Sequence, residues 1–271
     1  MVAVGTSAGS IGTFDHREFP VARAAGLKGS RTVSVCIPAR DEAATVARIV
    51  ATVRDGLMGR AGLVDELVVV DDGSLDATAS LAARAGARVV TSGSRGTGGE
   101  PVAAGKGGAM RAGVAATTGD IVVFLDADVT NMRPHFVSGL VGPLLACART
   151  VLVKGSYTRP LHGSPSGGGR VTELVARPLL ALLFPELAGV AQPLAGETAV
   201  RRTALDEIEL APGYGVEMAL LLDVAERFGP AAIAQVDLGA RAHRNRTLAE
   251  LAPQAREVIA AALARARAPA G

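Results

Sequence analysis

Two aspartates one residue apart, Asp126 and Asp128, follow a largely apolar run over residues 120–125. A run of this kind after a turn signal is typical of a buried parallel strand. Side chains alternate along an extended chain, so both carboxylates should point to the same side where the strand ends. Ligands of open α/β sheets bind at that edge, and carboxylates there can hold a divalent cation and, through it, a diphosphate. The alternative is a solvated pair that merely ends the strand.

Two other turns carry polar groups suited to a nucleoside. Residues 38–42 (PARDE) follow a predicted strand, and their backbone together with Glu42 or Asp41 could hold a base or ribose. Residues 71–74 (DDGS) end the next predicted strand and could present Asp72 to a uracil or a ribose hydroxyl. For each turn taken alone, an ordinary acidic or Asx cap is the favoured interpretation. Together with the paired aspartates they place three polar turns at one sheet edge, which favours a site.

Two motifs could bind anions. Lys106 opens a predicted helix within the G-K-G of residues 105–107, where it could neutralise a diphosphate beside free helix amides. The spacing does not fit a Walker loop, and a surface lysine is the alternative. The glycines of residues 167–169 precede Arg170 and Thr172, so free amides and a guanidinium could bind a phosphate or carboxylate. The alternative for this segment is a linker and a solvated arginine.

Two further residues are candidates for substrate or metal contacts. Glu217 lies in the first turn of a predicted apolar helix, where it could accept sugar hydroxyls or assist proton transfer, or only complement the helix dipole. His243 lies in the basic stretch of residues 241–246. Imidazole can complete a Mn²⁺ site that two aspartates leave open, although a lone histidine is commonly a surface residue.

The elements that must position these residues alternate between strands and helices in the first half of the chain. Residues 1–30 show little periodicity and are expected to be mostly irregular. Strands are expected over residues 32–38, 66–70, 87–90, 120–125, 150–157, 196–200 and 233–238. Helices are expected over residues 43–53, 76–85, 106–116, 173–183 (kinked or split at Pro178), 215–228 and 248–264, and residues 91–105 and 164–169 are expected to be glycine-rich loops. This order predicts an α/β fold with a mainly parallel sheet flanked by helices.

No internal repeat or linker divides the chain, so residues 1–271 are expected to form one domain. We expect residues of about 30–130 to form a nucleotide-sugar-binding half and residues of about 131–265 an acceptor-binding half. The net charge of +2 argues against a bulk nucleic-acid binder. Cys36 and Cys147 form no disulfide framework and are expected to be buried thiols of a reduced, cytoplasmic protein. Neither a signal peptide nor a membrane span is expected, because no apolar stretch is long enough.

Several of these motifs together resemble those of the glucosyl-3-phosphoglycerate synthases, which are retaining glycosyltransferases of the GT-A fold known in actinobacteria. The resemblance covers residues of about 32–264, and its motifs in order are VSVCIPARDE, VVVDDGSLDAT, GKG, DIVVFLDAD, GGGRVTELVARPLL, APGYGVE and AHRNRTLAEL. The fifth and sixth motifs are the discriminating ones, because glycosyltransferases in general share only the first half. One departure is Ala127, at the centre of the D-x-D, where a serine is familiar; another is that some relatives continue further after the last helix.

The resemblance implies roles for individual residues. The donor UDP-glucose would contact Pro38, Ala39, Arg40, Glu42, Asp72, Lys106, Asp126, Ala127, Tyr214, Glu217, Arg241 and Arg246. Mg²⁺ or Mn²⁺ would bind Asp128 and His243, with Asp126 as the other member of the D-x-D. The acceptor 3-phosphoglycerate would contact Gly169, Arg170, Thr172 and Asn245. Glu217, Asp128 and Lys106 are the expected catalytic residues.

The activity that the resemblance implies is transfer of glucose from UDP-glucose to the 2-hydroxyl of D-3-phosphoglycerate. No nucleophile stands out in the sequence, so retention would imply front-face attack by the acceptor. A homodimer is implied by the resemblance alone. A mannosyl-3-phosphoglycerate synthase using GDP-mannose, or an enzyme using both donors, is the alternative within the class. A sugar nucleotidyltransferase fits less well, because residues 38–42 lack the glycine-rich phosphate loop expected after the first strand of such enzymes.

Overall fold

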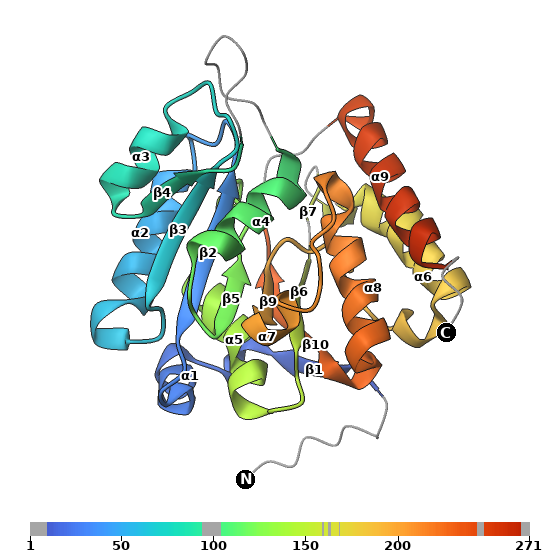
Figure 1. Cartoon of the computed structure of the whole chain (residues 1–271), viewed down its shortest axis with the longest axis horizontal. Helices are drawn as coiled ribbons and strands as arrows, with labels where there is room; N and C mark the ends of the chain where they lie inside the picture. Colours follow the sequence, from blue (N-terminus) through green and yellow to red (C-terminus); the bar gives the residue numbers. More distant parts are fainter. Residues whose placement is uncertain are drawn as a thin grey trace.

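The structure is a computed structural model of the whole chain. It describes residues 10–93, 104–158, 160–161, 164–167, 169–242 and 247–266. Within these residues, eight strands form one sheet in the order β1-β10-β6-β9-β5-β2-β3-β4. Neighbours in this sheet are parallel except β9, which is antiparallel to both β5 and β6. The mainly parallel α/β architecture predicted from the sequence is therefore confirmed (Figure 1).

The strands of the sheet match the predicted ones to within a few residues from the first apolar run onward. Their bounds are β1 (Gly12–Asp15), β2 (Val33–Ala39), β3 (Glu66–Asp71), β4 (Arg88–Thr91), β5 (Ile121–Phe124), β6 (Leu152–Thr158), β9 (Thr198–Arg201) and β10 (Ile233–Ala240). Two short strands, β7 (Pro160–Leu161) and β8 (Ser164–Gly167), pair with each other in antiparallel fashion outside this sheet.

Helices cover both faces of the sheet, as the crossovers between parallel strands require. Their bounds are α1 (Val21–Lys28), α2 (Val46–Leu57), α3 (Thr78–Ala85), α4 (Gly105–Ala116), α5 (His135–Ala146), α6 (Arg177–Leu183), α7 (Arg202–Leu205), α8 (Val216–Phe228) and α9 (Leu248–Ala266). Alternate residues of each central strand face opposite sides of the sheet, which creates two apolar layers. Val123 packs in the layer that includes α2 and α5, whereas Val122 packs in the layer that includes α4 and α8.

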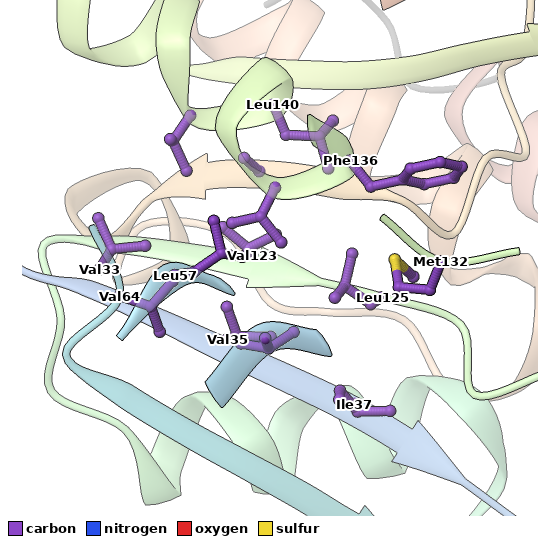
Figure 2. Close-up of a cluster of buried hydrophobic side chains, with 14 of the residues drawn as sticks. Val33, Val35, Ile37, Leu57, Val64, Val123, Leu125, Met132, Phe136 and Leu140 are labelled. Carbon is purple, nitrogen blue, oxygen red and sulfur yellow. The ribbon is translucent and has the colours of Figure 1, made fainter. Parts of the chain in front are cut away.

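Figure 2 shows the first of these layers, where side chains of β2, β5, α2 and α5 meet. Val35 and Ile37 of β2 and Phe136 of α5 are almost completely buried there. Each buried aliphatic or aromatic side chain contributes roughly 1.5–3 kcal/mol of transfer free energy. This packing fixes the strands, and so it also fixes the loops that follow their carboxyl ends.

Three sequence expectations were wrong. Residues 10–30, the described part of the first thirty, are not mostly irregular: β1 and α1 lie there, and β1 pairs with β10 at the sheet edge. The segment before Gly169 is not only a loop, because Ser164–Gly167 form β8, while residue 168 lies outside the described residues. Cys36 is buried as expected, but Cys147 is only partly buried at the end of α5. Most of the loop expected over residues 91–105, namely 94–103, also lies outside the described residues.

The expected break near Pro178 is present. A π-helical turn, η3 (Thr172–Ala176), leads directly into α6, with the proline in the first turn of that helix. The amide of Arg177 donates to the carbonyl of Thr172 in the π-helical turn, while Pro178 has no amide to donate. Among the described residues, no helix is long and apolar enough to cross a membrane.

Candidate active site

A cleft of about 680 Å³ lies at the carboxyl ends of the parallel strands. It brings together the three polar turns predicted from the sequence, the start of α4, the glycine-rich segment before η3, the start of α8 and one side of α9. The residues that line it are Pro38, Ala39, Arg40, Asp41, Glu42, Asp72, Gly105, Lys106, Ala109, Asp126, Ala127, Asp128, Gly169, Arg170, Val171, Thr172, Leu194, Tyr214, Glu217, Arg241, Glu250, Leu251, Pro253, Gln254 and Val258.

The turns after β2 and β3 are bound to each other by hydrogen bonds. Asp72 donates its amide to the carbonyl of Ala39 at 2.9 Å, and Asp41 accepts from the amide of Leu75 at 2.8 Å. Asp41 holds a left-handed conformation with φ of 54°, which is uncommon outside glycine. The Asp72 carboxylate accepts from the amide of Ala104 at 2.7 Å, next to the start of α4. One wall of the cleft is thus a rigid pair of loops.

The two aspartates of the D-x-D converge on one guanidinium. Nη2 of Arg241 lies 2.7 Å from Oδ2 of Asp126 and 3.0 Å from Oδ1 of Asp128. The expectation that both carboxylates point to the same side is therefore confirmed. Arg241 follows β10 and is only 3% exposed, and its guanidinium also lies over the ring of Tyr157. Burial opposes the charge of Arg241, but Glu197 and the neighbouring acidic groups raise its pKa above the usual value.

Lys106 connects the D-x-D to Glu217. Its Nζ donates to Oδ1 of Asp126 at 2.6 Å and contacts Oε1 of Glu217, which is 6% exposed. Although burial favours the neutral amine, Asp126 and Glu217 raise the pKa of Lys106 above its usual value, so the ammonium is retained. Lys106 and Glu217 are each placed by the first turn of a helix, α4 and α8 respectively.

Two buried charged residues beneath this cluster were not predicted from the sequence. Glu197 precedes β9 and is fully buried, with Oε1 accepting from Nε of Arg241 at 2.8 Å. Lys154 of β6 is 1% exposed and donates to the carbonyl of Ala195 at 2.7 Å. Burial lowers the pKa of Lys154 to about 8. No sequence motif marks either residue, because each is paired with groups more than forty residues away.

The C-terminal helix α9 forms a wall of the cleft, which the sequence did not indicate. Oε2 of Glu257 accepts from the amide of Tyr214 at 2.5 Å. Gly213 beside it has φ of +66°, and a Cβ there would lie 2.0 Å from Oε2 of Glu257. A larger residue at position 213 would therefore be both strained and in collision. α9 thus holds the turn that presents Tyr214 to the cleft.

Three of the predicted acceptor residues, Gly169, Arg170 and Thr172, lie at the start of η3 and line the same cleft. Gly169 has φ of +75°, and the amide of Glu173 donates to its carbonyl at 3.0 Å. Thr172 is 2% exposed, whereas Arg170 is half-buried. An arginine, a threonine and a glycine in the left-handed region thus line one stretch of the cleft.

The structure therefore brings most of the candidate residues together. Fifteen of them line one cleft, and the remaining three lie outside the described residues. Those in the cleft are Pro38, Ala39, Arg40, Glu42, Asp72, Lys106, Asp126, Ala127, Asp128, Gly169, Arg170, Thr172, Tyr214, Glu217 and Arg241. Those outside the described residues are His243, Asn245 and Arg246.

The D-x-D oxygens suit a divalent cation. Both carboxylates meet a single cationic nitrogen of Arg241, so they can converge on one positive centre. Carboxylate oxygen is the donor that Mg²⁺ prefers, and Mn²⁺ accepts it too. Within the described part of the chain, no group of three acidic, histidine or cysteine side chains could form a complete metal site. Asp126 and Asp128 would therefore need further ligands from His243 or from the phosphates of a bound nucleotide.

Comparison with known proteins agrees with this geometry. The sequence model of Glycosyl transferase family 2 matches residues 34–161. Glucosyl-3-phosphoglycerate synthase of Mycolicibacterium smegmatis is 51% identical over 257 residues, which cover 93% of this chain and 84% of the relative. The enzyme of the same name from Petrotoga mobilis is 42% identical over 260 residues, 93% of this chain and 80% of the relative.

Solved structures extend the similarity to three dimensions. Glucosyl-3-phosphoglycerate synthase of Mycobacterium tuberculosis, crystallised with Mn²⁺, UDP-glucose and phosphoglyceric acid, superposes with a TM-score of 0.85. It is 48% identical, and the match covers 96% of this chain and 88% of that one. The same enzyme with Mg²⁺ and UDP also superposes with a TM-score of 0.85, at 47% identity and the same coverage. By its sequence, its fold and the residues gathered in its cleft, this chain belongs to the glucosyl-3-phosphoglycerate synthase family.

Proposed function

We propose that this chain transfers glucose from UDP-glucose to the 2-hydroxyl of D-3-phosphoglycerate, with release of UDP and retention of configuration. The observation that carries the proposal is the convergence of Asp126 and Asp128 at the base of the cleft, beside Lys106. Relatives at about 50% identity bear the name of this activity, and one of them binds UDP-glucose, phosphoglyceric acid and Mn²⁺ together.

We propose the following division of the cleft. The turns after β2 and β3 hold the uridine, through Pro38, Ala39, Arg40, Glu42 and Asp72. Asp126 and Asp128, with His243, would hold Mg²⁺ or Mn²⁺, which when bound stabilises the charge of the departing UDP. Lys106, Arg241 and Arg246 share the negative charge of the diphosphate, while Ala127 leaves the centre of the D-x-D without a polar side chain.

The transferred glucose is assigned to the region between α8 and the D-x-D. Glu217 is paired with Lys106 and can accept hydrogen bonds from hydroxyls of the sugar, and Tyr214 lines the same cleft. Glu217 is already engaged by an ammonium group, so we propose that the acceptor hydroxyl attacks from the front face without a covalent enzyme intermediate. The acceptor phosphate is assigned to Gly169, Arg170 and Thr172, with Asn245 nearby.

We also propose that residues of about 30–130 bind the donor and residues of about 131–265 bind the acceptor within one domain. A homodimer and a cytoplasmic location complete the proposal. The homodimer is supported only by the family resemblance, and sedimentation of the purified chain would test it. The cytoplasmic location is supported by two cysteines that form no disulfide among the described residues.

The test is release of UDP by the purified chain with Mg²⁺, with and without 3-phosphoglycerate, and with GDP-mannose as a second donor. We expect release that requires UDP-glucose and 3-phosphoglycerate together. Asp128→Asn should lower kcat/KM by roughly 10²-fold or more, since it removes one of the carboxylates that would hold the divalent cation beside the diphosphate. Asp55→Asn is the matched control, because it removes an aspartate whose arginine pair is exposed on α2. Release from neither donor in response to the acceptor would contradict the assignment.

A further inference from the structure

The guanidinium of Arg241 contacts three carboxylates through two of its nitrogens. Nη2 faces the D-x-D, at 2.7 Å from Asp126 and 3.0 Å from Asp128. Nε donates to Oε1 of Glu197 at 2.8 Å. Since these contacts use different nitrogens, the position of the guanidinium depends on Glu197 as much as on the two aspartates.

Glu197 is held in place by its neighbours. The carbonyl of Ala195 accepts from Nζ of Lys154 at 2.7 Å and from the hydroxyl of Thr198 at 2.9 Å. The carbonyl of Glu197 accepts from the amide of Gly155 at 2.8 Å. The turn that carries Glu197 is therefore fastened on both sides, and the carboxylate remains opposite Arg241.

Glu197 cannot act on the substrates directly. It is fully buried and is not among the residues that line the cleft. Its Oε2 accepts no hydrogen bond among the described residues, although burying a carboxylate costs several kcal/mol unless it is well paired. If Glu197 served only to fill space, an apolar residue of similar size could take its place without loss of stability. Its one charged hydrogen-bond partner among the described residues is Arg241.

We infer that Glu197 is a positioning residue that shares the charge of Arg241, holds its guanidinium beside the D-x-D and so keeps Asp126 and Asp128 available to a divalent cation. Without the anion, the guanidinium charge would be neutralised by the two aspartates alone, and it would compete with the cation for their oxygens. The inference rests on the proposed function only in assigning the cation to the D-x-D.

The experiment measures Mn²⁺ binding to the full chain in the absence of nucleotide and acceptor, from the electron paramagnetic resonance signal of free Mn²⁺ up to millimolar concentrations. Glu197→Gln, which keeps the shape and removes the charge, should raise the Mn²⁺ Kd about tenfold, or about 1.4 kcal/mol. Glu197→Asp, which keeps the charge, should recover most of the affinity. Glu207→Gln is the control, because Glu207 pairs with Arg227 away from the cleft.

An unchanged or lower Mn²⁺ Kd in folded Glu197→Gln would overturn the inference, and so would an absence of Mn²⁺ binding by the parent chain. If Glu197→Gln does not fold, as judged by its thermal transition, the test compares Mn²⁺ binding by two other variants. These are Arg241→Gln and the double variant that combines Arg241→Gln with Glu197→Gln. The two should bind Mn²⁺ equally, because Glu197 acts through the guanidinium. A further loss in the double variant would contradict that route. The assay contains no sugar donor, so the measured Mn²⁺ Kd does not depend on whether the chain transfers glucose. Failure of the proposed function and failure of this inference can therefore be told apart.

Discussion

Replacing Gly196 with alanine should disable the site while leaving the fold largely intact. Gly196 lies directly against the carboxylate of Asp126, and its backbone is not in the left-handed region, so alanine brings no conformational strain. The added Cβ would lie 2.1 Å from Oδ1, 2.4 Å from Cγ and 2.5 Å from Oδ2 of Asp126. The effect of the substitution is therefore a collision with one carboxylate of the D-x-D.

The size of the effect follows from these distances. Ordinary contact begins at 3.4 Å, so the carboxylate must move by about 1 Å or more. That shift would break or lengthen the bonds that Asp126 accepts from Lys106 at 2.6 Å and from Arg241 at 2.7 Å. A displacement of about 1 Å in a catalytic group costs roughly 10²-fold in rate, and overpacking costs about 1–3 kcal/mol of stability.

The assay is UDP release dependent on 3-phosphoglycerate, together with thermal unfolding of the same preparation. We expect kcat/KM of Gly196→Ala to fall about 10²-fold while a single cooperative transition is retained. Gly189→Ala is the matched control, because a Cβ at Gly189 meets no atom within 4 Å. Activity of Gly196→Ala within twofold of the parent would refute the reasoning that Asp126 must keep this position.

Two other predictions concern the cleft wall and the sheet. Glu257→Ala removes the acceptor for the amide of Tyr214. The KM for UDP-glucose should rise about tenfold, which corresponds to the loss of one charge-assisted hydrogen bond. An unchanged KM in initial-rate measurements would exclude a role of Glu257 in holding the Tyr214 turn. Hydrogen bonds from the amide and hydroxyl of the threonine before β2 lower the pKa of Asp120. Their stabilising effect is present above about pH 4 and is lost as pH falls through the lowered pKa of Asp120. The difference in Tm between the parent and Asp120→Asn should therefore shrink in acid. A difference in Tm that does not depend on pH would argue against this account.

The parts of the fold that could be predicted from the sequence are those with local signals. β2, β3 and β5 are apolar runs that end in polar turns, and they were located to within about two residues. β1 has only four residues, and its strand character comes from pairing with β10 rather than from its own pattern. A short segment of this kind acquires its conformation from tertiary contacts, which local propensity does not report.

The residues of the candidate site also fall into those with a local sequence signal and those without one. Asp126, Asp128 and Lys106 were found because each lies at the junction of a strand or helix with a loop, where a polar residue is conspicuous. Glu197 and Lys154 were missed because buried charges look, in sequence, like ordinary surface residues. Their burial depends on partners brought to them by β6, β9 and β10, and sequence patterns within a single element contain no information about those partners.

The pairing of β1 with β10 has a consequence for how the chain is made. Thr13 lies opposite Gln235 in the sheet, 222 positions further along the chain. During synthesis, β1 leaves the ribosome before β10 and has no partner strand among those described until β10 emerges, whereas β2, β3 and β4 can already assemble with one another. At roughly 5–20 residues per second, that interval is on the order of ten to forty seconds. The nascent protein therefore has to keep an unpaired strand out of wrong associations during that interval, and Arg241, just after β10, reaches the D-x-D only when the interval ends.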